Sequence, residues 1–113
     1  MKPVVFIDDE EMLCRAVRMV LSAAGIPIET FVDPALALTY LDEHEVTAVI
    51  CDYRMPLLSG LDVLARLPRP VPFYLVSGEL EIGHPDGVLA VFEKPFQMQR
   101  LVEVARQHAG PET

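Results

Sequence analysis

The sequence is short of positive charge and of long apolar runs. Its 113 residues hold nine lysines and arginines against 17 aspartates and glutamates, a formal charge of −8. Nucleic acids and anionic membrane surfaces both attract Lys and Arg, so we expect neither as a direct partner. No apolar stretch approaches the roughly 20 residues of a membrane-spanning helix, and the N-terminus lacks a signal-peptide pattern. We therefore expect a cytoplasmic protein.

Cysteine is also scarce, with two residues in the whole chain. Cys14 falls in a helical pattern and Cys51 in a strand pattern, far apart in the sequence. Both are expected to be buried small hydrophobic residues, not a disulfide or a metal pair. The three histidines have no ligand spacing, and we expect them on the surface.

Just over half of the residues (51%) are hydrophobic, enough for the core of one domain. Strand and helix patterns alternate along the chain, which predicts a parallel sheet with helices on both faces. The five expected strands are 4–7, 28–32, 46–51, 73–76 and 88–92. The four expected helices run from about residue 10 to the stop at Gly25, then over 34–43, 60–67 and 97–108.

The connection between the fourth and fifth strands breaks this alternation. Residues 79–87 are polar and contain Gly83, Pro85 and Gly87, which favour turns over helix. The sequence therefore predicts an α/β protein with a doubly wound, five-stranded parallel sheet whose fourth helix is shortened or missing.

Polar and charged residues stand at the ends of four predicted strands. Asp8 and Asp9 follow the first strand and Asp52 the third, while Ser77 follows the fourth and Lys94 the fifth. In open parallel sheets, ligands bind beyond the carboxyl ends of the strands, where these residues stand. Clustered carboxylates favour a cation such as Mg²⁺, a carboxylate can attack phosphorus, and a lysine can neutralise phosphoryl charge. The pattern predicts a site for a divalent cation and a phosphoryl group.

Four sequence fragments, in this order and at strand ends, resemble the response-regulator receiver domains of two-component signalling. The fragments are Val5-Phe6-Ile7-Asp8-Asp9-Glu10, Asp52-Tyr53-Arg54-Met55-Pro56 with Ser59-Gly60, Val76-Ser77-Gly78, and Glu93-Lys94-Pro95-Phe96. The resemblance extends from Lys2 to about His108 and implies the flavodoxin-like fold of that family. We expect a receiver domain over residues 1–109, a short tail over 110–113 and no output domain.

The resemblance also implies roles for individual residues. Asp52 would be the phosphoacceptor, and Ser77 the switch hydroxyl. Lys94 would pair with the phosphoryl group and precede Pro95 through a cis bond.

The same resemblance implies a cofactor and partners. Asp8 or Asp9, together with Asp52 and the backbone carbonyl of Arg54, would hold Mg²⁺. The phosphoryl donor would be a sensor histidine kinase or a histidine phosphotransfer protein, and the output a downstream protein effector or phosphorelay. Beyond its own phosphorylation and dephosphorylation, the domain would catalyse nothing.

Two features depart from the family pattern. The bulky aromatic residue usually found three positions before the lysine is replaced by Val91. Phe92 is adjacent, but a one-residue offset in a strand points to the opposite face. The stretch from Ser77 to Lys94 is also shorter than usual, so we expect an unconventional output surface.

Three alternative functions differ from this one in the residues that they require. A receiver-like scaffold that binds partners without phosphorylation would explain the missing aromatic residue. A phosphatase of the haloacid dehalogenase type needs two carboxylates spaced by one residue, whereas Asp8 and Asp9 are adjacent. A flavodoxin-like electron carrier needs a hydroxyl- and glycine-rich phosphate loop after the first strand, and the sequence has none there.

Overall fold

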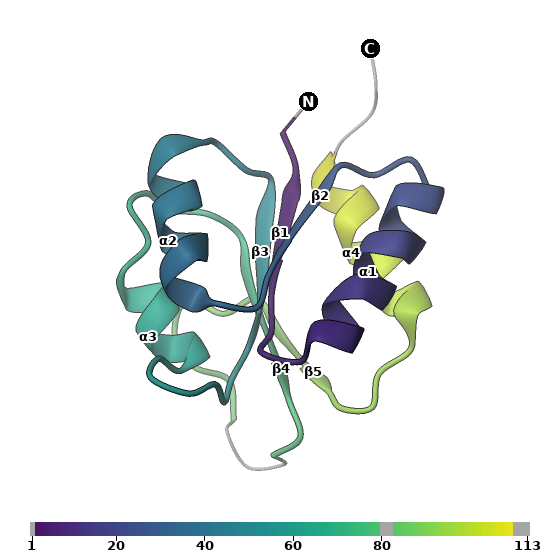
Figure 1. Cartoon of the computed structure of the whole chain (residues 1–113). Helices are drawn as coiled ribbons and strands as arrows, with labels where there is room; N and C mark the ends of the chain where they lie inside the picture. Colours follow the sequence, from purple (N-terminus) through teal and green to yellow (C-terminus); the bar gives the residue numbers. More distant parts are fainter. Residues whose placement is uncertain (1, 80–82, 110–113) are drawn as a thin grey trace.

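The computed structural model of the chain describes residues 2–79 and 83–109, so the expected tail over 110–113 lies outside the described residues (Figure 1). Within the described part, the five predicted strands and four predicted helices are all present. In chain order they are β1 Val4–Ile7, α1 Glu11–Ala23, β2 Ile28–Phe31, α2 Pro34–Glu43, β3 Ala48–Asp52, α3 Gly60–Ala65, β4 Phe73–Ser77, β5 Ala90–Glu93 and α4 Met98–Ala109.

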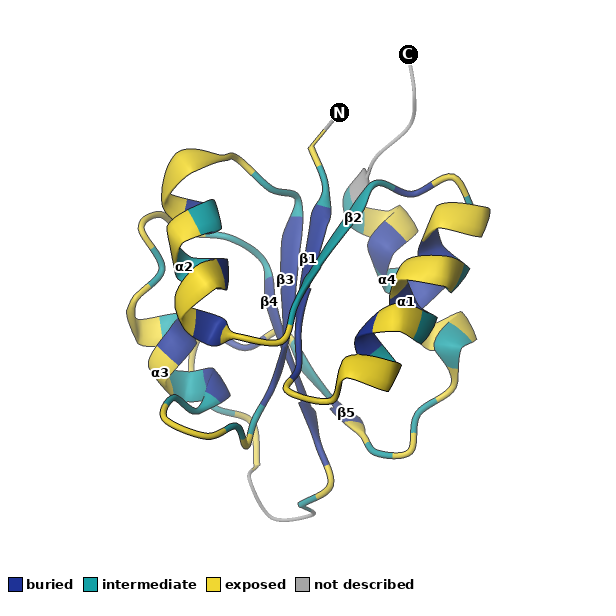
Figure 2. Ribbon diagram, in the orientation of Figure 1, coloured by how far each residue is buried: buried dark blue, intermediate teal, exposed yellow. Residues whose placement is uncertain are grey.

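The strands form one parallel sheet in the order β2-β1-β3-β4-β5. Helices α1 and α4 cover one face, and α2 and α3 cover the other (Figure 1). Every residue of β1, β3 and β4 is buried, as expected of apolar strands enclosed on both faces (Figure 2). This arrangement confirms the predicted doubly wound fold. None of the helices within 2–79 and 83–109 is long and apolar enough to cross a membrane.

Local sequence signals set several helix ends. Asp33 caps α2 by accepting a hydrogen bond from the Ala35 N–H at 2.9 Å, and Pro34 begins the helix. Gly25 follows α1 with a φ of 79°, a conformation that glycine adopts without strain. Ser59 and Asp62 form a reciprocal capping box that starts α3 directly after the loop from β3.

The connection from β4 to β5 contains no helix in residues 78–79 and 83–89, the part of it that the structure describes. Residues 80–82, which the predicted polar stretch includes, lie outside that part. Gly87 has a φ of 84° and packs against α3, where an added Cβ would lie 3.3 Å from Leu64 Cδ2. In members of the resembled family, a helix usually connects the fourth and fifth strands. Here this connection contains a turn that packs against α3.

Neighbouring residues of β5 face opposite sides of the sheet, as the one-residue offset predicted. Val91 packs with the α2 and α3 side of the core. Phe92 is buried on the α1 and α4 side and stacks on Tyr74, with ring centroids 5.8 Å apart. The surface prediction is wrong for His108. This side chain is half-buried, with Nε2 2.5 Å from the Tyr74 hydroxyl, because the last turn of α4 packs back onto β4.

Candidate functional site

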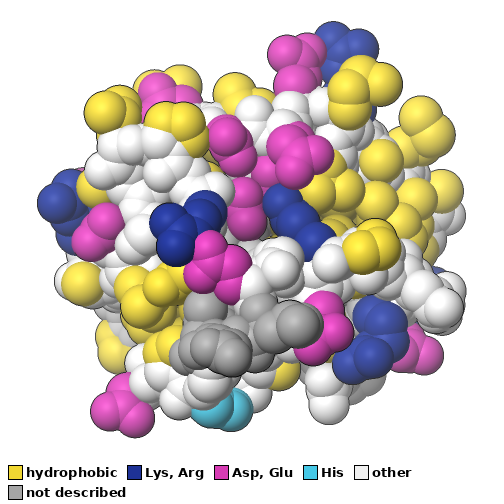
Figure 3. Space-filling model, turned by 90° about the horizontal axis from the view of Figure 1, so that it is seen from below, with side chains coloured by type: hydrophobic (Ala, Val, Ile, Leu, Met, Phe, Trp, Pro, Cys, Tyr) yellow, Lys and Arg dark blue, Asp and Glu magenta, His cyan; other side chains and the backbone are white. Residues whose placement is uncertain are grey.

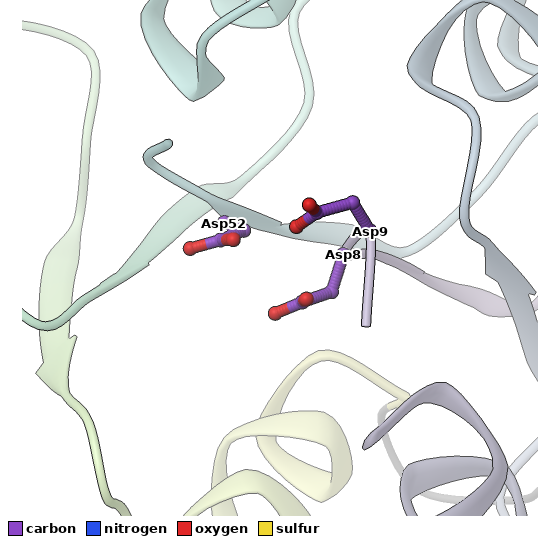
Figure 4. A group of neighbouring side chains, drawn as sticks. All are labelled: Asp8, Asp9 and Asp52. Carbon is purple, nitrogen blue, oxygen red and sulfur yellow. The ribbon is translucent and has the colours of Figure 1, made fainter. Parts of the chain in front are cut away.

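Three aspartates meet at the carboxyl edge of the sheet. Asp8 follows β1, Asp9 comes next in the chain, and Asp52 is the last residue of β3. One carboxylate oxygen from each lies within 4.8 Å of the other two, and the side chains reach into the same space (Figure 4). Asp8 and Asp52 are buried, whereas Asp9 is exposed. The cluster is therefore anchored in the core and open to solvent on one side.

Asp8 is the most deeply buried member, with no exposed surface. Its Oδ1 accepts a hydrogen bond from the Glu10 N–H at 2.9 Å, and its carbonyl accepts one from the Cys14 thiol at 3.2 Å. Burial, followed by the charge of Asp8, raises the pKa of Cys14 to about 11, so this thiol is a neutral donor. The second oxygen, Asp8 Oδ2, has no hydrogen-bond partner among the described residues.

Lys94 brings a positive charge to the cluster from the end of β5. Its Nζ lies 3.0 Å from Asp8 Oδ2, 3.2 Å from Glu10 Oε1 and 3.4 Å from Asp52 Oδ1. The contact with Asp8 is close enough for an ion pair but lacks the direction of a hydrogen bond, so Oδ2 stays unsatisfied. The Lys94–Pro95 peptide bond is cis, as predicted. Figure 3 shows acidic and basic side chains gathered near the centre of this face.

Burial and mutual repulsion shift the pKa values of these groups. Burial is the main cause that raises the pKa of Asp8, against the Glu10 N–H and Lys94, which lower it. Burial and then the charge of Asp8 raise the pKa of Asp52 from 3.8 to about 6. Burial alone would lower the pKa of Lys94, but its carboxylate neighbours outweigh burial and raise it. The site therefore holds more negative charge than its single lysine balances.

Ser77 ends β4 beside the cluster and is buried. Its Oγ accepts a hydrogen bond from the Glu79 N–H at 2.9 Å. All of the predicted site residues except the fully buried Asp8 line one pocket, together with three residues that were not assigned to the site, Glu10, Gly78 and Glu79. The pocket is lined by Asp9, Glu10, Asp52, Arg54, Ser77, Gly78, Glu79 and Lys94.

Gly60 allows the loop after Asp52 to fold back on the sheet. Its N–H donates to the Tyr53 carbonyl at 2.9 Å. A Cβ at this position would lie 2.6 Å from Leu75 Cδ2 and 2.7 Å from the Asp52 carbonyl oxygen. Only glycine fits so close to the backbone of Asp52, so Gly60 helps to fix the position of this carboxylate.

The family model described as the response regulator receiver domain matches residues 4–106. The chain belongs to this family. The match extends from β1 into α4 and includes every residue of the pocket.

Curated relatives of this receiver domain include longer regulatory proteins. The C4-dicarboxylate transport transcriptional regulatory protein DctD of Rhizobium meliloti is 34% identical over 114 residues, which cover 93% of this chain and 25% of that protein. The response regulator protein TodT of Pseudomonas putida is 28% identical over 111 residues, covering 91% of this chain and 49% of that protein. This chain thus spans between a quarter and a half of these two relatives.

Solved receiver structures share the fold. A response regulator receiver domain protein from Clostridium thermocellum superposes with a TM-score of 0.85 at 21% identity, covering 96% of this chain and 94% of that one. The response regulator TrrA from Thermotoga maritima, solved in complex with Mg²⁺ and BeF, gives a TM-score of 0.82 at 22% identity, covering 95% and 98% of the two chains. These likenesses confirm the flavodoxin-like topology of the receiver domain.

Sequence reasoning missed the side-chain partners around the pocket rim. Glu10 was not predicted to take part in the site, yet it contacts Lys94. Glu79 was assigned to a polar loop, yet it pairs with Arg54. A signal for the second pair is present in the spacing. Arg54 and Glu79 each stand two positions after a strand-end residue, on neighbouring strands β3 and β4.

Proposed function

We propose that this receiver domain is a phosphorylation-dependent signalling switch that accepts a phosphoryl group on Asp52. The observation that carries the proposal is the meeting of Asp52 with Asp8, Asp9 and Lys94 at one sheet edge. Carboxylate oxygens lie within 4.8 Å of each other, and the ammonium of Lys94 lies 3.4 Å from Asp52 Oδ1. Ligands for a cation and a charge partner for a phosphoryl group are thus side by side.

In the proposed step, a carboxylate oxygen of Asp52 attacks the phosphorus of a phosphohistidine. A P–O bond forms while the P–N bond breaks, and its electron pair stays on the imidazole nitrogen, which takes a proton from solvent. Lys94 pairs with the phosphoryl oxygens, and the Ser77 hydroxyl donates a hydrogen bond to one of them. Water later cleaves the acyl phosphate to inorganic phosphate and restores the carboxylate. The domain changes only its own state and is not an enzyme for other substrates.

Asp8, Asp9, Asp52 and the backbone carbonyl of Arg54 would hold Mg²⁺. The donor set fits this ion, because Mg²⁺ prefers oxygen ligands and keeps several waters, for which the exposed side of the cluster leaves room. The buried Asp8 Oδ2, which has no hydrogen-bond partner within the described residues, supports the same conclusion. When bound, the ion would neutralise charge on the phosphoryl oxygens.

An apolar groove beside Lys94 supports docking of a protein donor, either a sensor histidine kinase or a histidine phosphotransfer protein. Hydrophobic side chains gather to one side of the charged centre in Figure 3. The groove is lined by Glu10, Leu13, Lys94, Pro95, Phe96 and Met98. A donor helix seated there would place its phosphohistidine over Asp52. We further propose that the domain works in the cytoplasm, contacts neither DNA nor membrane directly, and acts on a protein effector.

The test is the intact mass of the protein after incubation with acetyl phosphate, with and without Mg²⁺. We expect the wild type to gain one phosphoryl group in a Mg²⁺-dependent manner and Asp52→Asn to gain none. Asp42→Asn is a matched control, since Asp42 is exposed on α2. If Asp52→Asn took up phosphate as efficiently as the wild type, the assignment of the nucleophile would be wrong.

A second candidate is a receiver-like scaffold that binds its partner without phosphorylation. It is favoured by Val91 in place of the usual aromatic residue and by the absence of helix in the described part of the β4–β5 connection. A scaffold would bind its effector equally well as wild type and as Asp52→Asn, with or without acetyl phosphate. A switch would bind differently only as the phosphorylated wild type.

A further inference from the structure

Two charged residues at the rim of the pocket are paired across it. Arg54 lies in the loop after β3, and Glu79 lies after β4. Both line the pocket that contains Asp52, Ser77 and Lys94. The Arg54 Nε donates to Glu79 Oε1. The guanidinium is therefore paired with a carboxylate and is not free to bind an anion in the pocket.

This pair is connected to the hydroxyl of Ser77. The Glu79 N–H donates to Ser77 Oγ at 2.9 Å, so the backbone of Glu79 is held by the side chain that would contact a phosphoryl group. The order of contacts is Ser77 to Glu79 backbone, Glu79 carboxylate to Arg54, and Arg54 to the loop that begins at Asp52. A rotation of the Ser77 side chain towards Asp52 would remove the bond that holds Glu79.

Energetics indicate that the pair has little value for stability. The Arg54 side chain is 75% exposed and that of Glu79 is 39% exposed, and pairs of this kind stabilise proteins weakly. The pair matters instead because it fixes the position of the positive charge of Arg54. A phosphoryl group carries nearly two negative charges and three acceptor oxygens, so it attracts a guanidinium more strongly than one carboxylate does.

We infer that Arg54 is a phosphoryl-positioning residue which Glu79 holds aside in the unphosphorylated protein, and which Ser77 releases when its hydroxyl turns to the phosphoryl group. This inference rests on the proposed function and names a regulatory part of the same site. Through this pair, a change at Ser77 could be passed on without an aromatic residue. Val91 holds the position of the usual aromatic residue, and Phe92 faces the opposite side of the sheet.

The test is a double-mutant cycle on the initial rate of phosphorylation by acetyl phosphate with Mg²⁺, followed by intact mass. Glu79→Gln frees Arg54 for the anionic donor and should raise the rate about two- to fivefold, the range expected for breaking an exposed ion pair. Arg54→Gln should lower the rate by a similar factor. The double variant should match Arg54→Gln, because Glu79 acts only through Arg54.

Glu93→Gln is the matched control for loss of one negative charge. Glu93 is exposed at the same edge of the sheet but lines a different pocket, so its substitution should leave the rate within the error of the wild type. If Glu79→Gln accelerated the reaction equally with and without Arg54, Glu79 would act by repelling the donor, and the inference would be wrong. Equal rates in the wild type and all variants would overturn it too. A wild type that gained no phosphoryl group would overturn the proposed function and this inference together.

A second measurement follows Arg54 directly through the Nε–H resonance in ¹H–¹⁵N spectra. Addition of Mg²⁺ and beryllofluoride, a phosphoryl mimic, should shift this resonance in the wild type as Arg54 changes partner. Ser77→Ala should move the resonance of the free protein towards its position in Glu79→Gln, because Glu79 has lost its anchor. A resonance that stays at the wild-type position in Ser77→Ala would contradict the proposed connection.

Discussion

Asp52→Asn should stabilise this protein in the absence of metal at neutral pH. Asp52 is only 6% exposed, and its carboxylate lies within 4.8 Å of those of Asp8 and Asp9. Asparagine keeps the shape of the side chain and removes its charge. Its amide can also donate hydrogen bonds, which a carboxylate at this position cannot do. The substitution that should abolish phosphorylation should therefore raise the free energy of unfolding.

The magnitude follows from the pKa of Asp52. Burial and the charge of Asp8 raise this pKa from 3.8 to about 6, even though Lys94 lies 3.4 Å away and lowers it. One pKa unit corresponds to about 1.4 kcal/mol, so holding Asp52 ionised costs about 3 kcal/mol of the free energy of unfolding. A neutral side chain avoids this cost, and we expect a gain of about 2–3 kcal/mol.

The sign of the pH dependence is fixed by the same shift. Because the pKa of Asp52 is higher in the folded protein, the folded state binds more protons than the unfolded state between pH 3.8 and about 6. The free energy of unfolding of the wild type therefore falls as pH rises through this window. Asp8 has a raised pKa as well and contributes in the same direction. Lys94, with its raised pKa, stays charged throughout this range and adds no slope.

The assay is urea unfolding of wild type and Asp52→Asn in EDTA, at about pH 4 and about pH 7.5, repeated with Mg²⁺ at neutral pH. The difference between the two proteins should be close to zero at the acidic pH and reach about 2–3 kcal/mol at the neutral pH. Mg²⁺ should stabilise the wild type by about 2.7 kcal/mol at a hundredfold excess over its dissociation constant, and the variant by less. A variant less stable than the wild type in EDTA at neutral pH would refute the reasoning.

Two further substitutions test the loop that follows Asp52. Gly60→Ala forces a Cβ to within 2.7 Å of the Asp52 carbonyl oxygen, so we expect a loss of about 1–3 kcal/mol in urea unfolding and a slower uptake of phosphoryl groups by intact mass. Unchanged uptake would mean that the loop can shift without moving Asp52. Leu57 has a φ of 72° and is fully exposed, so Leu57→Gly should relieve backbone strain and raise the free energy of unfolding by about 1 kcal/mol. A loss of stability in the same measurement would contradict this assignment of strain.

Much of the fold could be predicted because the sequence signals are local. The Asp33-Pro34 pair caps α2 where expected, and the apolar runs become fully buried strands. Boundaries were less accurate where tertiary contacts set them. The fifth strand was predicted from Val88, but it begins at Ala90, because Val88 is still part of a turn in which its N–H donates to the Pro85 carbonyl at 3.2 Å.

The site could be predicted from the rule that parallel strands end at one edge. That rule predicts that Asp8, Asp52, Ser77 and Lys94 lie together, and the structure places them together. The rule could not predict the side-chain pairs at the rim of the pocket, because these contacts depend on the path of two loops and on the conformations of long side chains. His108 was misplaced for a related reason, since its contact with Tyr74 joins residues 34 positions apart.

The register of β5 limits which side chains could respond to a conformational change at Ser77. Val91 and Phe92 cannot both face Ser77, because successive strand residues point to opposite faces, and the larger of the two is committed to a stack with Tyr74. Tyr74 in turn contacts His108 in the last turn of α4. On the other face, the turn at Gly87 packs against Leu64 of α3. Ser77, by contrast, is hydrogen-bonded to the Glu79 N–H, and among the described residues the exposed Arg54–Glu79 pair is the part of the site that can rearrange at least cost.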